Sequence, residues 1–150
     1  MYAWTGEPWK TADVVRAAQT LFTNGPEGMT GNDDLGTVSS WYVLSSLGLY
    51  PSMSGGSFFV LSTPQFPHAV LSLGAIGSRQ GGTLTIDAAG GSAARRYVGA
   101  ASLDGRPVRR TWVTRAAIAH GGRLAFDVYA HPTRWGTAPS AAPPSVARGR

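Results

Sequence analysis

The 150-residue sequence contains no cysteine, so it can form neither a disulfide framework nor a metal site built on thiolates. It also lacks a long hydrophobic run, because serines and Gly48 interrupt its longest apolar stretch, residues 38–50. That stretch is too short to cross a bilayer, and the first residues lack the basic start and apolar run of a signal peptide. We therefore expect no membrane partner and no export signal in this chain.

Charged residues are scarce as well, at 14% of the sequence, and the basic ones are dispersed. Thirteen Lys and Arg against eight Asp and Glu give a formal net charge of +5, yet the densest basic groups are only pairs. Nucleic-acid binding needs a concentrated basic face, so we expect no nucleic-acid partner. With 43% hydrophobic residues, the composition suits one globular domain or a part of a larger one.

Two segments in the first third have apolar residues at helical spacing. The first predicts a helix over residues 12–23, with Thr11 as its cap and residues 24–26 as its end. The second, residues 37–47, carries apolar side chains around nearly its whole circumference, with small serines between them. Such a helix needs cover on several sides, which one amphipathic neighbour cannot provide. We infer that the chain is a fragment of a larger helical fold.

After Pro51 the apolar residues alternate with polar ones, which predicts short β-strands. The predicted strands span residues 58–62, 69–73, 83–87, 97–103, 108–113 and 124–129. Asp104-Gly105 predicts a type I′ hairpin, since both central positions of that turn need positive φ, and residues 114–119 predict a short helical crossover. Proline and alanine dominate residues 132–150, which we predict to be a disordered tail.

One cluster of acidic and amide side chains, Gly31-Asn32-Asp33-Asp34, lies directly before the second predicted helix. Carboxylates at a helix N-terminus are stabilised in their ionised form by the unpaired backbone N–H groups there. An ionised carboxylate is what a general base or a calcium ligand requires. Taken alone, however, Asn-Asp-Asp before a helix is more often a cap or a turn.

The cluster begins a longer run, GNDDLGTVSSWYVLSSLGLYP over residues 31–51, which resembles the signature segment of glycoside hydrolase family 92. Upstream, residues 6–11 are similar to that family's link before its last barrel helices. Downstream, residues 103–107 and 121–124 are similar to its C-terminal β-region. The resemblance covers residues 2–136, and the central run is its most specific part.

The resemblance implies an α+β fold class, in which the last helices of an (α/α)6 barrel precede a small antiparallel β-sandwich-like region, as a fragment of a larger fold. It assigns residues 1–50 to the barrel helices and the base-bearing loop. It assigns residues 51–131 to a C-terminal β-rich region and leaves 132–150 as the disordered tail. The missing N-terminal portion of the enzyme is then an expected partner.

The resemblance also implies an enzyme that removes terminal α-linked mannose with inversion, using a calcium ion that contacts the sugar. It gives the role of general base to Asp34, with Asp33 as the second choice. The amide of Asn32 is expected to position water or sugar. Inversion needs a second carboxyl group as acid, roughly 6.5–9.5 Å from the base. In this family that acid and most calcium ligands lie upstream of the segment present here, so the metal ligands within this chain are unknown.

These observations support two functional hypotheses. In the first, the chain is a fragment of a calcium-dependent inverting exo-α-mannosidase that acts on mannose-containing glycans, with α-1,2 linkages as the expected substrate, and is inactive alone. The resemblance then implies a secreted or extracellular enzyme. In the alternative, the chain is a non-catalytic β-rich module that binds carbohydrate or serves as a structural domain, and Asp33 and Asp34 are caps only.

Overall fold

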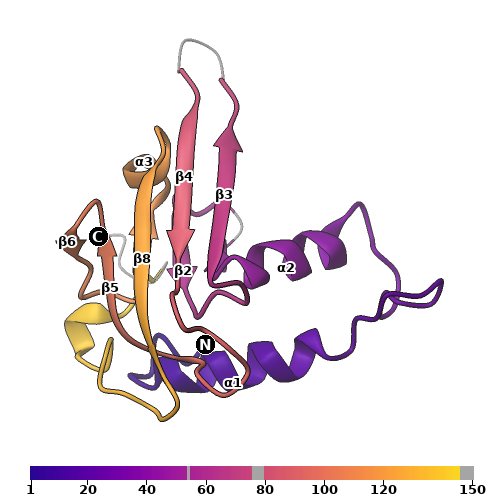
Figure 1. Ribbon diagram of the computed structural model, residues 1–150, viewed down its shortest axis with the longest axis horizontal. Helices are drawn as coiled ribbons and strands as arrows, with labels where there is room; N and C mark the ends of the chain where they lie inside the picture. The colour runs from indigo at the N-terminus through magenta and orange to yellow at the C-terminus, as the bar shows by residue number, and fades with distance from the viewer. Residues whose placement is uncertain (54, 76–79, 146–150) are drawn as a thin grey trace.

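The computed structural model describes residues 1–53, 55–75 and 80–145, and Figure 1 shows their arrangement. Two helices come first, and strands with a third short helix and a 3-10 turn follow them. In chain order the elements are α1 (Pro8–Gln19), α2 (Thr37–Ser46), β1 (Leu49–Tyr50), β2 (Phe58–Leu61), β3 (His68–Leu73), β4 (Gly82–Asp87), β5 (Tyr97–Leu103), β6 (Arg106–Pro107), β7 (Trp112–Thr114), α3 (Arg115–Ile118), β8 (Gly122–Tyr129) and η1 (Pro139–Ala141). Within the described residues, no helix has the length and apolar character needed to span a membrane.

Helix α1 begins at Pro8 and ends at Gln19, so the predicted range of 12–23 lay too far toward the C-terminus. Proline suits the first turn of a helix because its missing N–H would have no partner there and its φ is already helical. At the other end, the backbone N–H of Thr23 donates to the carbonyl of Gly28 at 2.9 Å. Residues 20–23, which were predicted to continue the helix, therefore lead into a loop that this hydrogen bond closes.

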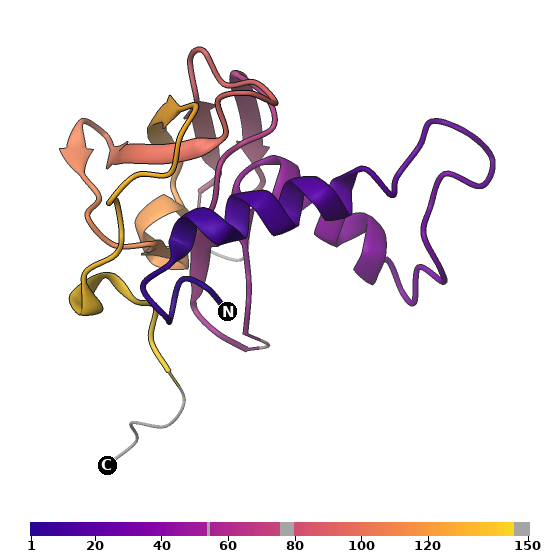
Figure 2. The same cartoon turned by 90° about the horizontal axis from the view of Figure 1, so that it is seen from below.

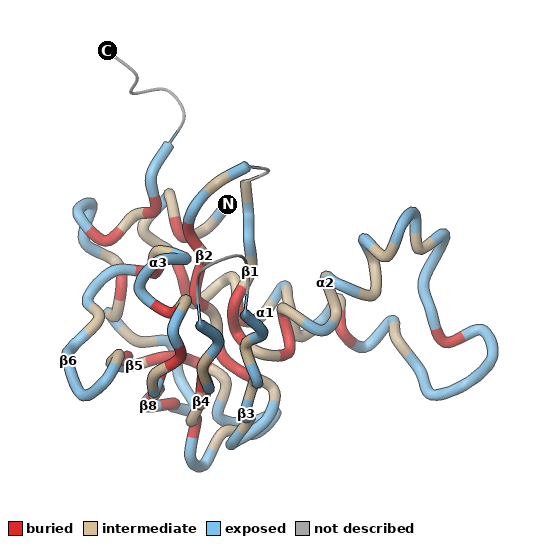
Figure 3. Tube along the Cα trace, turned by 90° about the horizontal axis from the view of Figure 1, so that it is seen from above, coloured by how far each residue is buried: buried red, intermediate tan, exposed pale blue. Residues whose placement is uncertain are grey.

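Helix α2 matches its predicted range, 37–47, within one residue. It runs beside α1 (Figure 2) but is not enclosed, because its only buried residues are Ser45 and Ser46 and Val43 is 55% exposed. Figure 3 shows α2 and the loop before it projecting away from the buried strands. The exposure agrees with the inference that this apolar helix needs more cover than the chain provides.

The strands form two sheets that pack around one core. A three-stranded sheet has the order β1-β2-β7, and a five-stranded sheet has the order β3-β4-β8-β5-β6. The β4–β8 pair is parallel, so the region is mixed and not purely antiparallel as predicted. The parallel pair arises because a crossover through β5, β7 and α3 brings β8 back beside β4. The largest fully buried side chains belong to Leu61, Leu84, Ile86, Thr111 and Leu124.

Most of the predicted strands and turns are confirmed. Asp104 and Gly105 have φ of 50° and 76°, as the predicted hairpin requires, and they join β5 to β6. The predicted crossover is α3, whose first turn is capped when Thr114 Oγ1 accepts from Ala117 N at 3.1 Å. The predicted strand 108–113 is confirmed only at residues 112–113, which lie in β7, since residues 108–111 fall in the gap between β6 and β7.

The predicted disordered tail is also wrong for residues 132–145, which pack against the strands. Thr111 donates from its backbone N–H and from Oγ1 to the carbonyl of Ala141, at 3.0 and 2.9 Å. The indoles of Trp112 and Trp135 donate to the carbonyls of Ala142 and Val108, each at 3.0 Å. Thr111 and Trp112 thus donate from the body of the fold to carbonyls of this segment, and Trp135 donates from the segment to a carbonyl of the body. Residues 146–150 lie outside the described residues.

A buried polar contact joins α1 to α2. Gln19 is 7% exposed, and its side-chain amide donates to Ser45 Oγ at 3.1 Å and to Ser46 Oγ at 3.3 Å. The Ser46 hydroxyl donates in turn to Gln65 Oε1 at 2.8 Å, in the loop between β2 and β3. The ring of Phe22, just after α1, also contacts α2, with its centroid 4.6 Å from that of Tyr42. Helix α2 is therefore attached along one side, partly through hydrogen bonds.

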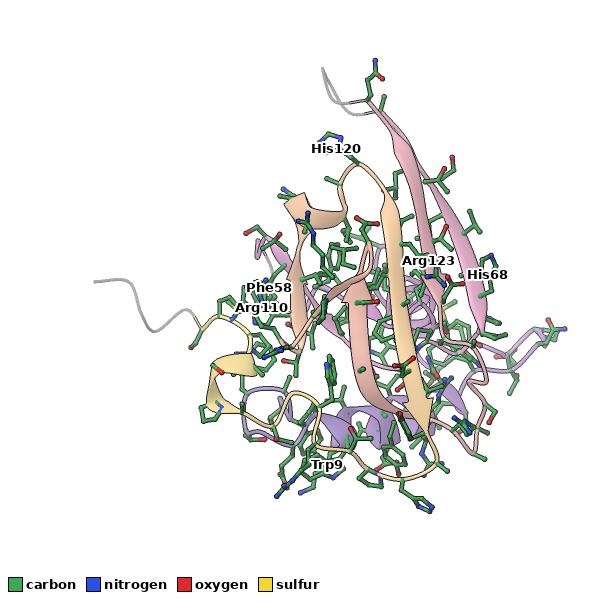
Figure 4. All side chains as sticks on the ribbon, turned by 60° about the vertical axis from the view of Figure 1, so that its left-hand side comes forward. Trp9, Phe58, His68, Arg110, His120 and Arg123 are labelled. Atoms are coloured by element: carbon green, nitrogen blue, oxygen red, sulfur yellow. The ribbon has the colours of Figure 1, made fainter. Side chains whose placement is uncertain are left out.

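A carboxylate bridges three strands on the five-stranded sheet. Oδ1 of Asp87 lies 2.6 Å from Nδ1 of His68 on β3, and its Oδ2 accepts a 2.6 Å hydrogen bond from Nε of Arg123 on β8. Figure 4 shows His68 and Arg123 on the same side of the sheet. The hydrogen bond with His68, followed by the one from Arg123, holds the pKa of the Asp87 carboxyl below its usual value.

We expect Gln19→Ala to lower the free energy of unfolding by about 1–3 kcal/mol, because it removes a buried donor that two serine hydroxyls share. Thr20→Ala is the matched control, since Thr20 is exposed and bonds only within its own turn, and it should change stability by less than about 0.5 kcal/mol. Urea unfolding measures both variants. Equal losses would show that the buried contact contributes nothing to the attachment of α2.

We expect Asp87→Asn to alter the pH dependence of stability. Because the pKa of Asp87 is lowered in the folded state, its stabilising effect is present above the ordinary carboxyl pKa and disappears as pH falls through the lowered value. The variant should therefore have a lower Tm than the parent at pH 6, with a gap that narrows toward pH 2. Circular dichroism melts measure the gap, and Asp127→Asn, an exposed carboxylate on β8, is the control. A gap independent of pH would contradict this account.

Candidate active site

The loop between α1 and α2 carries the acidic cluster and ends in an unusual turn. Three consecutive residues, Asp34, Leu35 and Gly36, have positive φ, at 32°, 60° and 84°. For residues with a Cβ this backbone region costs free energy, of order 1–3 kcal/mol each, and such positions gather at functional sites. The side chain of Leu35 projects fully into solvent. The turn thus holds the cluster in front of α2 at an energetic cost.

Asp33 caps α2 through its side chain from three residues before Gly36, the N-cap residue. Its Oδ1 accepts from the backbone N–H of Ser39 at 2.7 Å, and its Oδ2 accepts from the Ser39 hydroxyl at 2.9 Å. Its backbone carbonyl accepts from Thr37 N at 2.7 Å. Both carboxylate oxygens are thus engaged with one residue of the first helical turn, which is the ordinary capping role.

Asp34 differs from its neighbour, because its carboxylate makes no hydrogen bond or ion pair with any described residue and is exposed. Its backbone carbonyl accepts a 2.7 Å hydrogen bond from the Thr37 hydroxyl, which fixes the turn and leaves the carboxylate available. Asn32 is likewise exposed, and its amide has no partner among the described residues. A free carboxylate beside a free amide can take a proton from water, orient a hydroxyl or contribute to a cation site.

The loop does not by itself form a metal site. Among the described residues, no group of three or more His, Cys, Asp or Glu side chains is arranged to hold a metal ion. Calcium takes six to eight oxygen ligands, and Asp34 and Asn32 offer only a few. The donors present within the described part of the chain therefore do not make up a calcium shell.

Sequence reasoning brought Asn32, Asp33 and Asp34 together and, by resemblance, ranked Asp34 before Asp33 as the base, but it did not identify the contacts that distinguish the two aspartates. Ser39, the partner that occupies Asp33, was missed. Its position in the first turn of a predicted helix could have identified it, because a capping side chain bonds to the second or third helical N–H. The positive φ of Asp34 leaves no clear signal in the sequence, since aspartate also occurs in many other backbone conformations.

A family model described as the glycosyl hydrolase family 92 catalytic domain matches residues 1–130. An Arthroderma benhamiae protein described as an uncharacterized secreted glycosidase is 26% identical over 152 residues, which is 99% of this chain and 19% of that protein. A solved family GH92 inverting mannosidase from Bacteroides thetaiotaomicron shares 31% identity at a TM-score of 0.83, over 95% of this chain and 19% of that one. A GH92 α-mannosidase from the same organism gives 25% identity and a TM-score of 0.88, over 97% and 19%. The chain thus spans about a fifth of the length of these relatives.

The two aspartates should separate in stability measurements. Asp33→Ala is expected to lower the free energy of unfolding by about 0.5–2 kcal/mol, because it leaves a helical N–H without its cap. Asp34→Asn keeps a residue that tolerates positive φ and removes no hydrogen bond to a described residue, so a change below about 0.5 kcal/mol is expected. Urea unfolding of both variants measures the difference. A larger loss for Asp34→Asn would contradict the assignment of the cap to Asp33.

Proposed function

The chain belongs to glycosyl hydrolase family 92, and from that premise we propose that it is the C-terminal part of an inverting exo-α-mannosidase. In this proposal the enzyme removes terminal mannose, in α-1,2 linkage, from mannose-containing glycans. The names of the two Bacteroides thetaiotaomicron relatives support the reaction class. The relative described as secreted supports an extracellular enzyme.

The observation on which the proposal depends is that Asp33 has both carboxylate oxygens hydrogen-bonded, whereas the carboxylate of Asp34 has no partner among the described residues. A general base needs a carboxylate that is ionised, held in place and free to accept a proton. The turn fixes the position of Asp34, and its carboxylate oxygens, which have no described partner, are free to accept a proton. Asp33, the second candidate, has both oxygens bonded to Ser39, which favours a positioning role. We assign the base to Asp34 and the orientation of water or sugar to Asn32.

In the proposed reaction, Asp34 accepts a proton from a water molecule while the water oxygen forms a bond to the anomeric carbon. The bond from that carbon to the leaving oxygen breaks, and the leaving oxygen must receive a proton from a second carboxyl group. In an inverting enzyme that acid stands roughly 6.5–9.5 Å from the base. Glu27, the other carboxylate of the loop, is an exposed surface residue, so we place the acid outside this chain.

Calcium enters the proposal as an ion that contacts the sugar and whose ligands come mostly from elsewhere in the enzyme. The described residues hold no metal-binding group of three or more acidic or histidine side chains. Asp34 and Asn32 could contribute oxygen ligands at most, so no step of the reaction is assigned to the ion.

We further propose that helices outside this chain cover α2, as in an (α/α)6 barrel. The support is an uncovered apolar cleft of about 300 Å³ between the helices, whose lining includes Leu21, Val38 and Trp41. Leu21 is 61% exposed. Burying such side chains would stabilise the fold by roughly 1.5–3 kcal/mol for each one that becomes fully covered.

A segment exchange tests the proposal. The part of the Bacteroides thetaiotaomicron inverting mannosidase that corresponds to this chain is replaced by residues 1–145, and hydrolysis of an aryl α-mannoside is measured. We expect the exchanged enzyme to turn over substrate. Asp34→Asn in it should lower kcat by about 100-fold or more, as expected for the loss of a general base. Glu27→Gln, a carboxylate of the same loop, is the control and should leave kcat unchanged.

The stability of each exchanged variant separates loss of the base from loss of the fold. If Asp34→Asn keeps kcat while the protein remains folded, the base is not Asp34. The 150-residue chain alone, in buffer containing calcium, is expected to show no turnover. Turnover that disappears with EDTA and with Asp34→Asn would show that the chain holds a whole site and would overturn its assignment as a part of one. A folded exchanged enzyme without any activity would favour the non-catalytic module.

A further inference from the structure

A pocket of about 400 Å³ lies where α1, α2 and the segment that connects β4 to β5 meet. Arg16 and Arg96 line it from segments far apart in the sequence. The other described lining residues are neutral: Gln19, Thr20, Phe22, Tyr42, Gln65 and Ala93. The described lining thus includes two cations and no acidic side chain.

The guanidinium of Arg16 is fixed by neutral acceptors. Its Nη2 donates to the carbonyl of Pro64 at 2.7 Å, and its Nη1 donates to Gln19 Oε1 at 3.2 Å. None of the ion pairs among the described residues includes Arg16. Burial, followed by the charge of Arg96, lowers the pKa of Arg16. Two cations that line one pocket repel each other, and a bound anion would relieve that repulsion.

Arg96 has one carboxylate partner, but that partner is shared. Its Nε donates to Asp13 Oδ1 at 2.9 Å, and its Nη1 donates to the carbonyl of Ala93 at 3.0 Å. The same Asp13 oxygen accepts a 2.8 Å hydrogen bond from the Tyr97 hydroxyl. Nη2 of Arg96 makes no hydrogen bond with a described residue. Asp13 therefore holds Arg96 in place without entering the pocket, and donor capacity remains.

We propose that this pocket binds an oxyanion group, namely a carboxylate, a sulfate or a phosphate, between the guanidinium groups of Arg16 and Arg96. Planar guanidinium groups that are already fixed bind such groups through paired N–H donors with little loss of side-chain entropy. The rings of Phe22 and Tyr42, 4.6 Å apart, supply an apolar wall beside the cations. That combination fits either a free inorganic anion or an acidic group carried on a sugar ring. The inference does not depend on Asp34 or on mannosidase activity.

Titration of the 150-residue chain with sodium sulfate tests the proposal, with sodium chloride at matched ionic strength as the reference. Nuclear magnetic resonance follows the side-chain amides of Gln19 and Gln65 and the Nε–H of Arg16, which report from the pocket. We expect these signals to shift in a saturable way with sulfate but not with chloride. Shifts spread evenly over the exposed arginines would overturn the proposal.

Three variants identify the binding groups. Arg16→Gln is expected to weaken sulfate binding by about tenfold or more, because it removes charged donors from the anion. Arg16→Lys keeps the charge but loses the paired donors, so it should bind sulfate more weakly than the parent and more tightly than Arg16→Gln. Arg106→Gln makes the same charge change on exposed β6 and should bind as the parent does. The spectrum without sulfate checks that each variant is folded, and equal binding by Arg16→Gln and the parent would contradict the assignment.

A comparison of glucuronate with glucose distinguishes the two sources of the anion. Tighter binding of glucuronate than of sulfate, with no binding of glucose, would support an acidic group on a sugar ring that also contacts Phe22 and Tyr42. Tighter binding of sulfate would support a site for free inorganic anions. Failure of both anions to bind would overturn the proposal and would leave the assignment of Asp34 untouched.

Discussion

The buried contact of Gln19 with Ser45 and Ser46 is the constraint on which the helical part of this molecule depends. An apolar helix is usually held by side chains packed around it, but α2 buries only its two terminal serines. The hydrogen bonds from the Gln19 amide to the two serine hydroxyls therefore hold α2 against α1, together with the ring contact between Phe22 and Tyr42. Buried hydrogen bonds are directional, so they fix the rotation of α2 about its axis as well as its distance from α1.

That rotation determines where the acidic cluster lies. The loop that joins α1 to α2 ends in a turn. There, the Asp33 side chain and the backbone carbonyl of Asp34 both accept hydrogen bonds from the first turn of α2. Ser39 donates to the carboxylate of Asp33, whereas the carboxylate of Asp34, where the backbone is left-handed, is exposed to solvent. Two adjacent and chemically identical side chains have different surroundings because only the carboxylate of Asp33 bonds to the helix. The energetic cost of positive φ at Asp34 and Leu35 is offset by these hydrogen bonds.

How far the sequence predicts this arrangement differs between its parts. The apolar pattern of α2, the hairpin at Asp104-Gly105 and most strands follow from short-range rules, and the structure confirms them. The start of α1 was misplaced because Thr11 was preferred as a cap over Pro8 as a first-turn residue. The ordered segment at residues 132–145 was missed because its order comes from Thr111, Trp112 and Trp135, whose donors reach carbonyls that composition alone cannot pair. The distinction between Asp33 and Asp34 likewise depends on tertiary geometry.

Several side chains that lack a complement within the described residues belong to the helical part of the molecule. The largest fully buried side chains all lie in the β-region, where two sheets close over each other. The helical part instead holds the uncovered apolar cleft, the free carboxylate of Asp34 and the cation of Arg16, which has no carboxylate partner among the described residues. The apolar cleft needs side chains that pack against it. The carboxylate of Asp34 needs a proton donor or a substrate, and the cation of Arg16 needs a counter-ion. A helical part that presents all three is consistent with the proposal of a composite site, in which a second set of residues would supply the cover and the acid.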